Sequence, residues 1–528
     1  MNRREVLAAV SAGALLTTSN AWTRQAIAAS PDESQLSDFV MRFMREFEIP
    51  GIAIGIVLPD RPARMQGFGV RVLGHSAAVD ASTGFAIASN SKAFLAACLA
   101  LLVDSGKLGW DDPVVNHLPE FRMYDPVVTR MMTVCDLLVH RSGLPLGAGD
   151  LMQFPKTDHT REEILRALRY FSPASGFRAG YAYDNILYIV AGMLLERVAG
   201  LDWDSFVTKR IFEPLGMSDA VSNPTLVRGS NRAGRHARLG PPTRGMGRLE
   251  SIASDESALL GPAGGINVSV AGVMPWLAVQ LSRGLLPDGR RLWSEAQAAQ
   301  MWLPRTIIAS GPGPTAAMPQ QSVMQGYALG WGVSDYRGHR MLSHAGGLAG
   351  QVTRTTLMPE QGIGLVVFSN SEEGEAISGL RYALLDQLLG LPLFDWSTAM
   401  KQSQARAQEQ VLALVGNGDF AAPAGVPSLP LQRYVGRYRD PWYGDIVIAQ
   451  RRGQLTIDFT RTPAFKSALE PFGADVFRTR FPRGAGEDAV VTVAVANGGV
   501  TGITMRALSP LADFSFDFHH LRFAPVGS

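Results

Sequence analysis

The order of apolar and polar residues divides the chain into a long mixed region and a shorter region of a different kind. Between residues 30 and 393, short β-branched runs such as GIAIGIVL (51–58) alternate with longer helical patterns such as AFLAACLALLVDSG (93–106). Near the end of this region, GYALGWGVSD, MLSHAGGLAGQVTRTTLMP and IGLVVFSN are closely spaced strand candidates joined by turn signals. This order predicts an α+β domain in which helices precede a final antiparallel sheet.

From Leu431 to Ser528 the pattern has a period of two. The segments GDIVIAQRRGQLTIDF, DAVVTVAVANGGVTGITMRAL and FSFDFHHLRF alternate apolar and polar positions around Gly and Asn-Gly turns, which predicts a small antiparallel β-barrel or sandwich. A helix ending near Leu414 and the Pro- and Gly-rich segment GNGDFAAPAGVPSLP separate the two regions. We therefore assign residues 29–395 to the α+β domain, 396–430 to a helix and linker, and 431–528 to the β domain. Residues 228–248 and 303–321 are predicted long loops.

The composition is typical of a folded protein, and its net charge is close to zero. Of the 528 residues, 46% are hydrophobic and 18% charged, and 49 basic against 47 acidic side chains leave a net charge of +2. This balance does not favour a nucleic-acid partner. Cys98 and Cys135 stand in apolar surroundings and are predicted to be buried thiols. The nine histidines are scattered, so we expect no metal site and no cofactor.

The first 28 residues have the pattern of an export signal. Arg3 and Arg4 precede a short, weakly apolar stretch, and small residues around Ala28 provide a cleavage site. The paired arginines favour the twin-arginine route. The apolar run is far shorter than the roughly 20 residues that span a bilayer, so we expect no stable membrane anchor. A periplasmic mature protein follows, and the sequence leaves its oligomeric state open.

The segment FAIASNSKAFLAACLALL places Ser89 at the start of a predicted helix, with Lys92 three residues later on the same face. A helix N-terminus stabilises an oxyanion, and a partly desolvated amine one turn away can accept the proton of the serine. An N-cap serine followed by a solvated lysine would give the same spacing. However, Lys92 is the only one of the six lysines with a serine three positions before it, and its surroundings are apolar.

Two further segments carry side chains suited to the same chemistry. Tyr183 and Asn185 stand just before the helical pattern NILYIVAGMLLERVAG, where the tyrosine can relay a proton and the amide can bind a substrate. His344, Gly346 and Gly347 lie on the candidate strand MLSHAGGLAG. The histidine can donate a hydrogen bond or tune the tyrosine, and the glycines let a substrate carbonyl approach the backbone.

Together the elements S-x-x-K, Y-x-N and H-x-G, in this order, resemble the serine β-lactamase and penicillin-recognising family. The likeness is to its class C-like branch of esterases, D-aminopeptidases and DD-peptidases, and it covers roughly residues 35–390. Similar connecting motifs include LLVHRSGLP (137–145), IFEPLGM (211–217), GPAGGINVSVAGVMPWL (261–277) and YALGWG (327–332). The segment YVGRYRD (434–440) and the β-rich tail resemble the lipocalin-like C-terminal domain of some of these hydrolases.

The resemblance implies a role for each of these residues. Ser89 becomes the nucleophile, Lys92 and Tyr183 the pair that handles its proton, and Asn185 a substrate ligand, with either Lys92 or Tyr183 as the base. The resemblance further implies that His344 and Gly346 belong to the third motif, and that the backbone amides of Ser89 and Gly347 form the oxyanion hole.

The third motif departs from that of true β-lactamases, which carry K-T-G. Histidine and alanine stand at the lysine and threonine positions, which disfavours efficient penicillin hydrolysis and favours an amide or ester substrate. Family members with H-x-G include peptidases of unusual peptides. Six arginines between Arg228 and Arg248 are suited to a substrate with carboxylates, although a solvated loop would have the same composition. Linearised non-ribosomal peptides with D-residues are the most specific candidate substrates.

Three functions follow from these observations. The leading one is an exported serine peptidase or amidase that works through an acyl-enzyme on Ser89. The second is a carboxylesterase with the same machinery. The third, of another class, is an inactive protein that binds peptides or peptidoglycan. The absence of a G-x-S-x-G motif from the sequence argues against the α/β-hydrolase fold.

Overall fold

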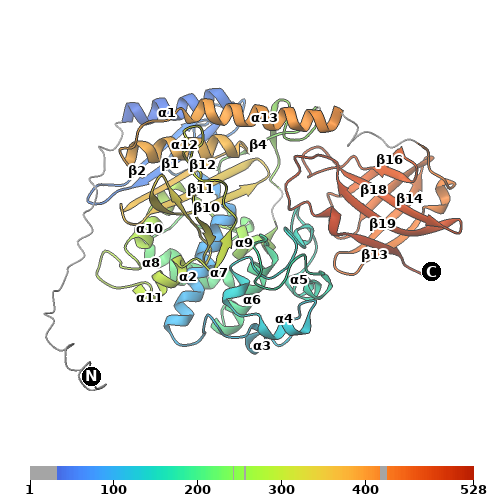
Figure 1. The fold of residues 1–528 in the computed structure, drawn as a ribbon, viewed down its shortest axis with the longest axis horizontal. Coiled ribbons are helices and arrows are strands. Elements are labelled where there is room, and N and C mark those ends of the chain that lie inside the picture. The colour runs from blue at the N-terminus through green and yellow to red at the C-terminus, as the bar shows by residue number, and fades with distance from the viewer. Residues whose placement is uncertain (1–32, 242, 255–256, 417–424, 528) are drawn as a thin grey trace, which may run out of the picture.

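The computed structural model describes residues 33–241, 243–254, 257–416 and 425–527. The predicted export signal, residues 1–28, and part of the predicted linker lie outside these ranges. Residues 33–416 form an α+β domain, and residues 425–527 form a second domain, the barrel domain, beside it (Figure 1). The predicted fold class is therefore confirmed.

The main sheet of the α+β domain has eight antiparallel strands in the order β2-β1-β12-β11-β10-β9-β8-β7. Strand β1 lies near the N-terminus of the domain, but it pairs with β12, so the sheet is complete only when the C-terminal part of the domain is in place. The strands are β1 (Gly51–Val57), β2 (Arg64–Gly69), β7 (Thr306–Ile308), β8 (Gln325–Tyr327), β9 (Gly332–Tyr336), β10 (His339–Leu348), β11 (Gln351–Met358) and β12 (Ile363–Ser369).

Three helices lie on one side of this sheet, namely α1 (Glu33–Phe47), α12 (Gly374–Leu388) and α13 (Trp396–Gly416) (Figure 1). The strands β1 and β12 are almost completely buried because the sheet is covered on both faces at this point. This explains why their sequences are continuous apolar runs rather than alternating ones. Helix α13, which we predicted as a separate element before the linker, packs on α12 and α1.

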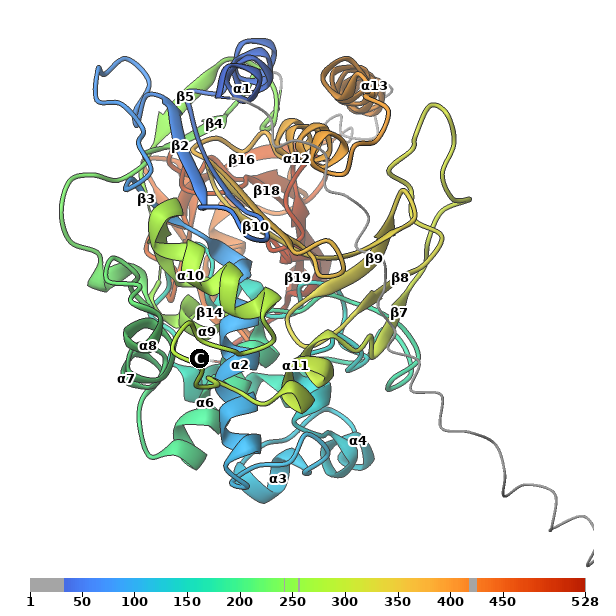
Figure 2. The ribbon, with the colours of Figure 1, turned by 90° about the vertical axis from the view of Figure 1, so that its left-hand side faces the viewer.

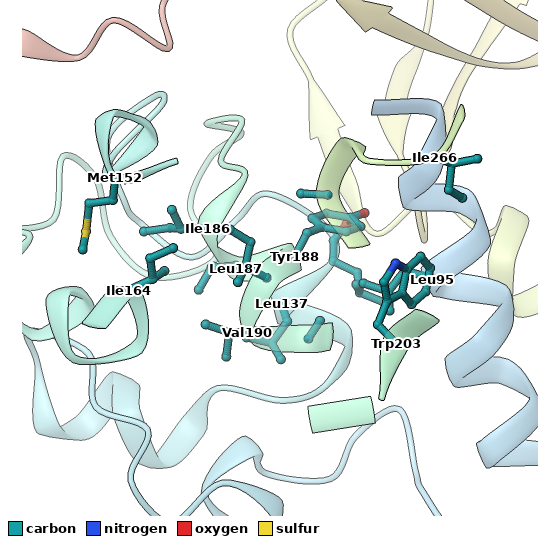
Figure 3. Close-up of a cluster of buried hydrophobic side chains, with 14 of the residues drawn as sticks. Leu95, Leu137, Met152, Ile164, Ile186, Leu187, Tyr188, Val190, Trp203 and Ile266 are labelled. Atoms are coloured by element: carbon teal, nitrogen blue, oxygen red, sulfur yellow. The ribbon is translucent and has the colours of Figure 1, made fainter. Parts of the chain in front are cut away.

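The helical region lies against the other face (Figure 2). Twelve of the fourteen residues of its central helix α2 are buried. Because this helix is surrounded by protein, apolar residues occur on all of its sides rather than on one face. Figure 3 shows part of the core that it shares with α6. The helices are α2 (Ser91–Asp104), α3 (Val114–His117), α4 (Pro126–Met131), α5 (Arg161–Ala167), α6 (Ile186–Ala199), α7 (Trp203–Val207), α8 (Glu213–Leu215), α9 (Gly261–Gly264), α10 (Val270–Leu281) and α11 (Glu295–Trp302).

The two predicted loops contain short strands. The arginine-rich segment holds β4 (Arg235–Arg238), which pairs with β5 (Leu249–Ile252) directly after the segment, and β7 lies within 303–321 at the sheet edge. Both predictions were wrong at these points because tertiary contacts order the backbone: His236, for example, is buried and bonds to the Asn370 carbonyl at 2.6 Å. A further short pair is formed by β3 (Gly84–Ala86) and β6 (Asn267–Ser269).

The barrel domain is a closed barrel of eight antiparallel strands, which confirms the period-two prediction. Its inward side chains form an aromatic core in which, for example, Phe465 stacks on Phe481 at 4.4 Å. The strands are β13 (Gly436–Asp440), β14 (Gly444–Arg451), β15 (Gln454–Phe459), β16 (Lys466–Gly473), β17 (Val476–Arg478), β18 (Ala489–Ala496), β19 (Gly499–Ala507) and β20 (Arg522–Pro525).

The two domains are joined by mixed polar and aromatic contacts. Arg461 of the barrel domain pairs with Glu163 at 2.5 Å, and Trp442 packs on Phe171 with ring centroids 4.9 Å apart.

Elsewhere Cys98 and Cys135 are buried free thiols, as predicted, and burial raises the pKa of both. Among the described residues, no helix is long and apolar enough to cross a membrane.

Candidate active site

Ser89 lies in a short 3-10 turn, η1 (Ala88–Asn90), that leads directly into α2. The preceding residue, Ala88, has a φ of 48°, a left-handed conformation that costs a non-glycine residue of order 1 kcal/mol. The turn is held in this shape by Asn90, whose amide donates to the Ile87 carbonyl at 2.9 Å and to Thr353 Oγ1 at 2.8 Å. Ser89 is thus presented to the cleft by a strained and tightly bonded turn.

Lys92 is completely buried, and its amine makes three hydrogen bonds. Nζ donates to Asn185 Oδ1 at 2.7 Å and to the Ala263 carbonyl at 2.7 Å, and it lies 3.1 Å from Ser89 Oγ. The first two partners can only accept hydrogen bonds. When Lys92 loses its proton, its two remaining N–H groups serve these acceptors and its lone pair faces Ser89. The arrangement therefore directs the neutral amine at the serine proton.

The charge state of Lys92 is set by its burial. Desolvation lowers the pKa of Lys92 to about 7, although the carboxylates of Asp150 and Asp184 oppose this shift. A substantial fraction of the amine is therefore neutral near pH 7. An unpaired lysine in water would be almost fully protonated at this pH.

Tyr183 contacts the same serine and lies close to Lys92. Its hydroxyl is hydrogen-bonded to Ser89, and the Lys92 ammonium lies 5.0 Å from the centre of its ring. Burial raises the pKa of Tyr183 well above its ordinary value, so the residue is a neutral phenol over the physiological range. The structure therefore brings Ser89, Lys92 and Tyr183 together as the sequence predicts.

Asn185 contacts the lysine in addition to lining the cleft. Its Oδ1 accepts from Lys92, and its Nδ2 donates to Asp150 Oδ2 at 2.9 Å. Three side chains donate to Asp150: Asn185, Ser515 at 2.8 Å and Gln153 at 2.8 Å. These bonds favour the carboxylate, but burial and the charge of Asp517 raise the pKa of Asp150 to about 8.

His344 is buried near Tyr183 and is not among the residues that line the cleft. Its Nδ1 donates to the Ala345 carbonyl at 2.7 Å, so its Nε2 accepts from the Tyr327 hydroxyl at 2.7 Å. Burial and the charge of Lys92 lower the pKa of His344 to about 3, which keeps the ring neutral. Both nitrogens are occupied within the protein. The geometry favours the predicted tuning of Tyr183, whose ring centre is 6.4 Å away, over a direct bond to substrate.

The two glycines of the third motif face in opposite directions. A Cβ on Gly346 would collide with the Ile87 carbonyl and the Thr353 hydroxyl, so this glycine lets β10 pack against the turn that carries Ser89. A Cβ on Gly347 would meet nothing within 4 Å, and Gly347 and Ser89 both line the cleft. This placement is consistent with their predicted oxyanion role, which stays a prediction.

A buried pair beside Tyr183 was not singled out by the sequence analysis. The Asp184 backbone amide donates to His140 Nδ1 at 3.2 Å, and the His140 ring lies 4.2 Å from that of Tyr183. The Asp184 carboxylate is buried and faces the charge of Lys92. Asp150 was also missed. The signal for it was a single acid in the otherwise apolar segment GLPLGAGDLMQF, where only a functional or paired charge would be buried.

The cleft above Ser89 has a volume of about 410 Å³ and receives residues from both domains. The α+β domain contributes the turn around Ser89, the β10–β11 turn and parts of α12 and α13. The barrel domain contributes Glu487, Leu511, Asp513, Ser515 and Phe516. The barrel domain is thus part of the cleft wall.

Arginines of the 228–248 segment reach this cleft, but their charge is offset. Of the six, Arg238 and Arg244 line the cleft. Arg238 pairs with Glu373 at 2.7 Å, and Arg244 pairs with Glu487 at 2.7 Å. The arginines therefore bring no large net positive charge to the wall.

Comparison with known proteins agrees with this geometry. A model of the Beta-lactamase family matches residues 36–388, and a model of a domain of unknown function, DUF3471, matches residues 421–525. Since the first match spans well over half of the chain, the protein belongs to the β-lactamase family. Within that family it is a serine hydrolase.

Individual relatives have low sequence identity to this chain, but the similarity extends over most of their length. An unguisins hydrolase of Aspergillus violaceofuscus is 27% identical over 463 residues, which is 83% of this chain and 80% of that protein. Penicillin-binding protein 4 of Amycolatopsis lactamdurans is 27% identical over 348 residues, which is 65% of this chain and 86% of that protein.

Solved structures show the same fold. An octameric penicillin-binding protein homologue from Pyrococcus abyssi has a TM-score of 0.58 at 20% identity, covering 93% of this chain and 100% of that chain. D-amino acid amidase from Ochrobactrum anthropi, complexed with L-phenylalanine amide, has a TM-score of 0.53 at 21% identity, covering 70% of this chain and 99% of that chain. Among the described residues, no group of three or more His, Cys, Asp or Glu is arranged to hold a metal ion.

Proposed function

We propose that the protein hydrolyses amide bonds of peptides through a covalent acyl-enzyme on Ser89. The observation that carries this proposal is the Lys92 amine, 3.1 Å from Ser89 Oγ and otherwise bonded only to acceptors. A buried amine with a pKa of about 7 in this position is a general base matched to neutral pH.

In the first step, Ser89 Oγ attacks the carbonyl carbon while its proton passes to the neutral amine of Lys92. The oxyanion is stabilised by the backbone amides of Ser89 and Gly347 in the role predicted for them. The C–N bond then breaks as the proton is delivered to the leaving nitrogen, with the neutral Tyr183 phenol placed to relay it. Water attacks the resulting ester, and the free acid leaves while Ser89 regains its proton.

The substrate we propose is a peptide that contains D-residues, including linearised non-ribosomal peptides. Two likenesses support this class: one relative is a hydrolase of unguisins, and one protein of the same fold is an amidase of D-amino acids. The cleft of about 410 Å³, closed on one side by the barrel domain, has room for several side chains. Substrate carboxylates would meet Arg238 and Arg244 only in competition with glutamates.

The test compares the full chain with its Ser89→Ala variant on one panel. The panel holds a chromogenic cephalosporin, a short nitrophenyl ester, D- and L-aminoacyl anilides and linear peptides with D-residues, analysed by mass spectrometry. We expect serine-dependent cleavage of peptides or anilides. A higher kcat/KM on short esters than on every amide would instead indicate a carboxylesterase. No cleavage of any compound in the panel would indicate an inactive protein that binds peptides or peptidoglycan.

We also propose that the chain is exported to the periplasm, on the strength of the signal pattern in residues 1–28. N-terminal sequencing of protein recovered from a periplasmic fraction tests this. A new N-terminus near residue 29 is expected, and an intact N-terminus found only in the cytoplasm would contradict export.

A further inference from the structure

A loop of the barrel domain reaches from β19 into the α+β domain and ends at the 3-10 turn η9 (Phe518–His520). Leu511, Asp513, Ser515 and Phe516 of this loop line the cleft, and the ring of Phe514 meets that of Tyr183 edge-on at 5.8 Å. The contact between the domains therefore extends to the side chains that surround Ser89.

Asp517, at the end of this loop, is buried and holds a turn of the other domain. Its Oδ2 accepts from the Gly149 amide at 2.9 Å, and its Oδ1 accepts from the Leu151 amide at 3.0 Å. These two amides flank Asp150. The carboxylate of Asp517 thus fixes the backbone on both sides of Asp150.

Ser515 completes the contact. Its hydroxyl donates to Asp150 Oδ2 at 2.8 Å, and the same oxygen accepts from Asn185 Nδ2 at 2.9 Å. Asn185 presents its other end, Oδ1, to Lys92 at 2.7 Å. A continuous series of hydrogen bonds therefore runs from the barrel domain through Asp150 and Asn185 to the amine beside Ser89.

We propose that Ser515 and Asp517 are positioning residues of the catalytic site, which hold Asp150 against Asn185 and so keep the Lys92 amine directed at Ser89. This inference rests on the function proposed above, because it assumes that Lys92 activates Ser89. It makes the barrel domain necessary for the rate of acylation, in addition to its place in the cleft wall.

Other contacts of the barrel domain do not touch this series, and they supply matched controls. Ser509, in the same loop, donates to the Arg244 carbonyl at 3.4 Å across the same interface. Asp475 accepts from the Ser428 amide at 2.8 Å within its own domain. Ser509→Ala and Asp475→Asn therefore repeat the chemical changes of Ser515→Ala and Asp517→Asn without reaching Asp150.

The first experiment measures the rate at which a small fluorophosphonate labels Ser89 in each full-length variant, followed by intact-mass spectrometry well below the unfolding temperature. Ser515→Ala and Asp517→Asn should slow labelling by about tenfold or more, since small displacements of catalytic groups cost rates of this order. The two controls should stay within about twofold, and Ser515→Thr, which keeps the hydroxyl, should recover most of the rate. A role in domain packing alone would lower Tm and leave the labelling rate of the folded protein unchanged.

The second experiment does not depend on turnover. NMR titration of the lysine ε-carbons, of which the chain has six, reports the pKa of Lys92 directly. Losing the Ser515 donor disfavours the Asp150 carboxylate, so Ser515→Ala should lower the pKa of Lys92 while Ser509→Ala leaves it unchanged.

The results separate the two proposals. A wild-type chain that is neither labelled nor active contradicts the proposed function, and the titration then still shows whether Ser515 acts on the Lys92 amine. A labelled wild type whose Ser515→Ala and Asp517→Asn variants keep its labelling rate and its Lys92 pKa contradicts the inference alone.

Discussion

Asp150 Oδ2 accepts a hydrogen bond from Asn185 Nδ2 at 2.9 Å, and this contact determines which end of the Asn185 amide faces Lys92. When Asp150 is ionised its carboxylate only accepts hydrogen bonds, so in this form the amide nitrogen must point to Asp150 and the amide oxygen to the lysine. If the amide were reversed, its N–H groups would face the N–H groups of Lys92. Lys92 would then lose the acceptor that keeps its amine directed at Ser89. Asp150 therefore acts on Ser89 indirectly, through the side chains of Asn185 and Lys92.

We predict that Asp150→Asn lowers kcat by about tenfold to a hundredfold, because an amide at this position no longer dictates the orientation of Asn185. Steady-state kinetics on the best substrate of the panel measures the change. Asp112→Asn is the control, since Asp112 accepts from the Gly109 amide at 2.8 Å in a loop away from the cleft. Equal kcat in the Asp150→Asn variant and the wild type would exclude this role.

The second prediction concerns pH. The active arrangement needs Lys92 without its proton and Asp150 as a carboxylate, and their pKa values are about 7 and about 8. Activity should therefore fall as pH decreases through the neutral range, and the acid limb of log kcat/KM should be steeper than one proton requires. A profile that is flat between pH 6 and pH 9 would show that neither group takes part in the step.

The third prediction is that Lys92→Met stabilises the fold while it abolishes activity. The pKa of Lys92 falls from 10.5 in the unfolded chain to about 7 in the fold. The unfolded state thus binds more protons between these values, and the burial penalty is complete below pH 7 and vanishes towards pH 10.5. We expect the free energy of unfolding to rise by about 2 kcal/mol at pH 6 and by less at pH 9.5, measured by denaturant titration. A loss of stability at pH 6 would contradict this account.

The fourth prediction uses neighbouring glycines as a matched pair. Gly346→Ala forces β10 away from the Ser89 turn and should lower the free energy of unfolding by about 1–3 kcal/mol, with loss of activity. Gly347→Ala adds a methyl group in open space, so Tm should stay near the wild-type value while substrate cleavage slows. Thermal unfolding with parallel kinetics distinguishes them, and equal Tm values for both variants would refute the assignment.

The fifth prediction concerns substrate charge. Because Arg238 and Arg244 already have carboxylate partners, amidating the C-terminus of a good peptide substrate should change kcat/KM by less than about threefold. Paired assays of the acid and the amide measure this. A preference for the acid of about tenfold or more, lost in Arg244→Gln, would instead support the anionic substrate that the arginine-rich segment predicts.

Much of the fold follows from local patterns in the sequence. The alternating runs of the barrel domain and the continuous apolar runs of β1 and β12 predict strands because each pattern reflects which faces are covered. The strands β4 and β7 were missed because their order comes from contacts with distant residues, which no local pattern records. The partner of β1 at the far end of the domain could not be read from the sequence either.

The site shows the same division. The sequence pointed to Ser89 and Lys92 by their spacing at the start of a helix and to Tyr183 and Asn185 by their place before another helix, and the family resemblance supplied their roles. The orientation of His344 away from the cleft depends on Tyr327, and the importance of Asp150 depends on Asn185 and Ser515. Such pairings arise only when segments far apart in the chain meet. The lone acid in the apolar segment GLPLGAGDLMQF is nevertheless a local signal for Asp150.

The central claim is that Ser89 is the nucleophile and Lys92 its base. The most direct measurement treats the full chain with a fluorophosphonate at pH 8 and locates the adduct by intact-mass and peptide mass spectrometry, beside the Ser89→Ala and Lys92→Met variants. We predict one adduct per chain on Ser89, none in Ser89→Ala, and labelling slowed at least about a hundredfold in Lys92→Met. An adduct on another residue, or equal labelling of Lys92→Met and the wild type, would contradict the account.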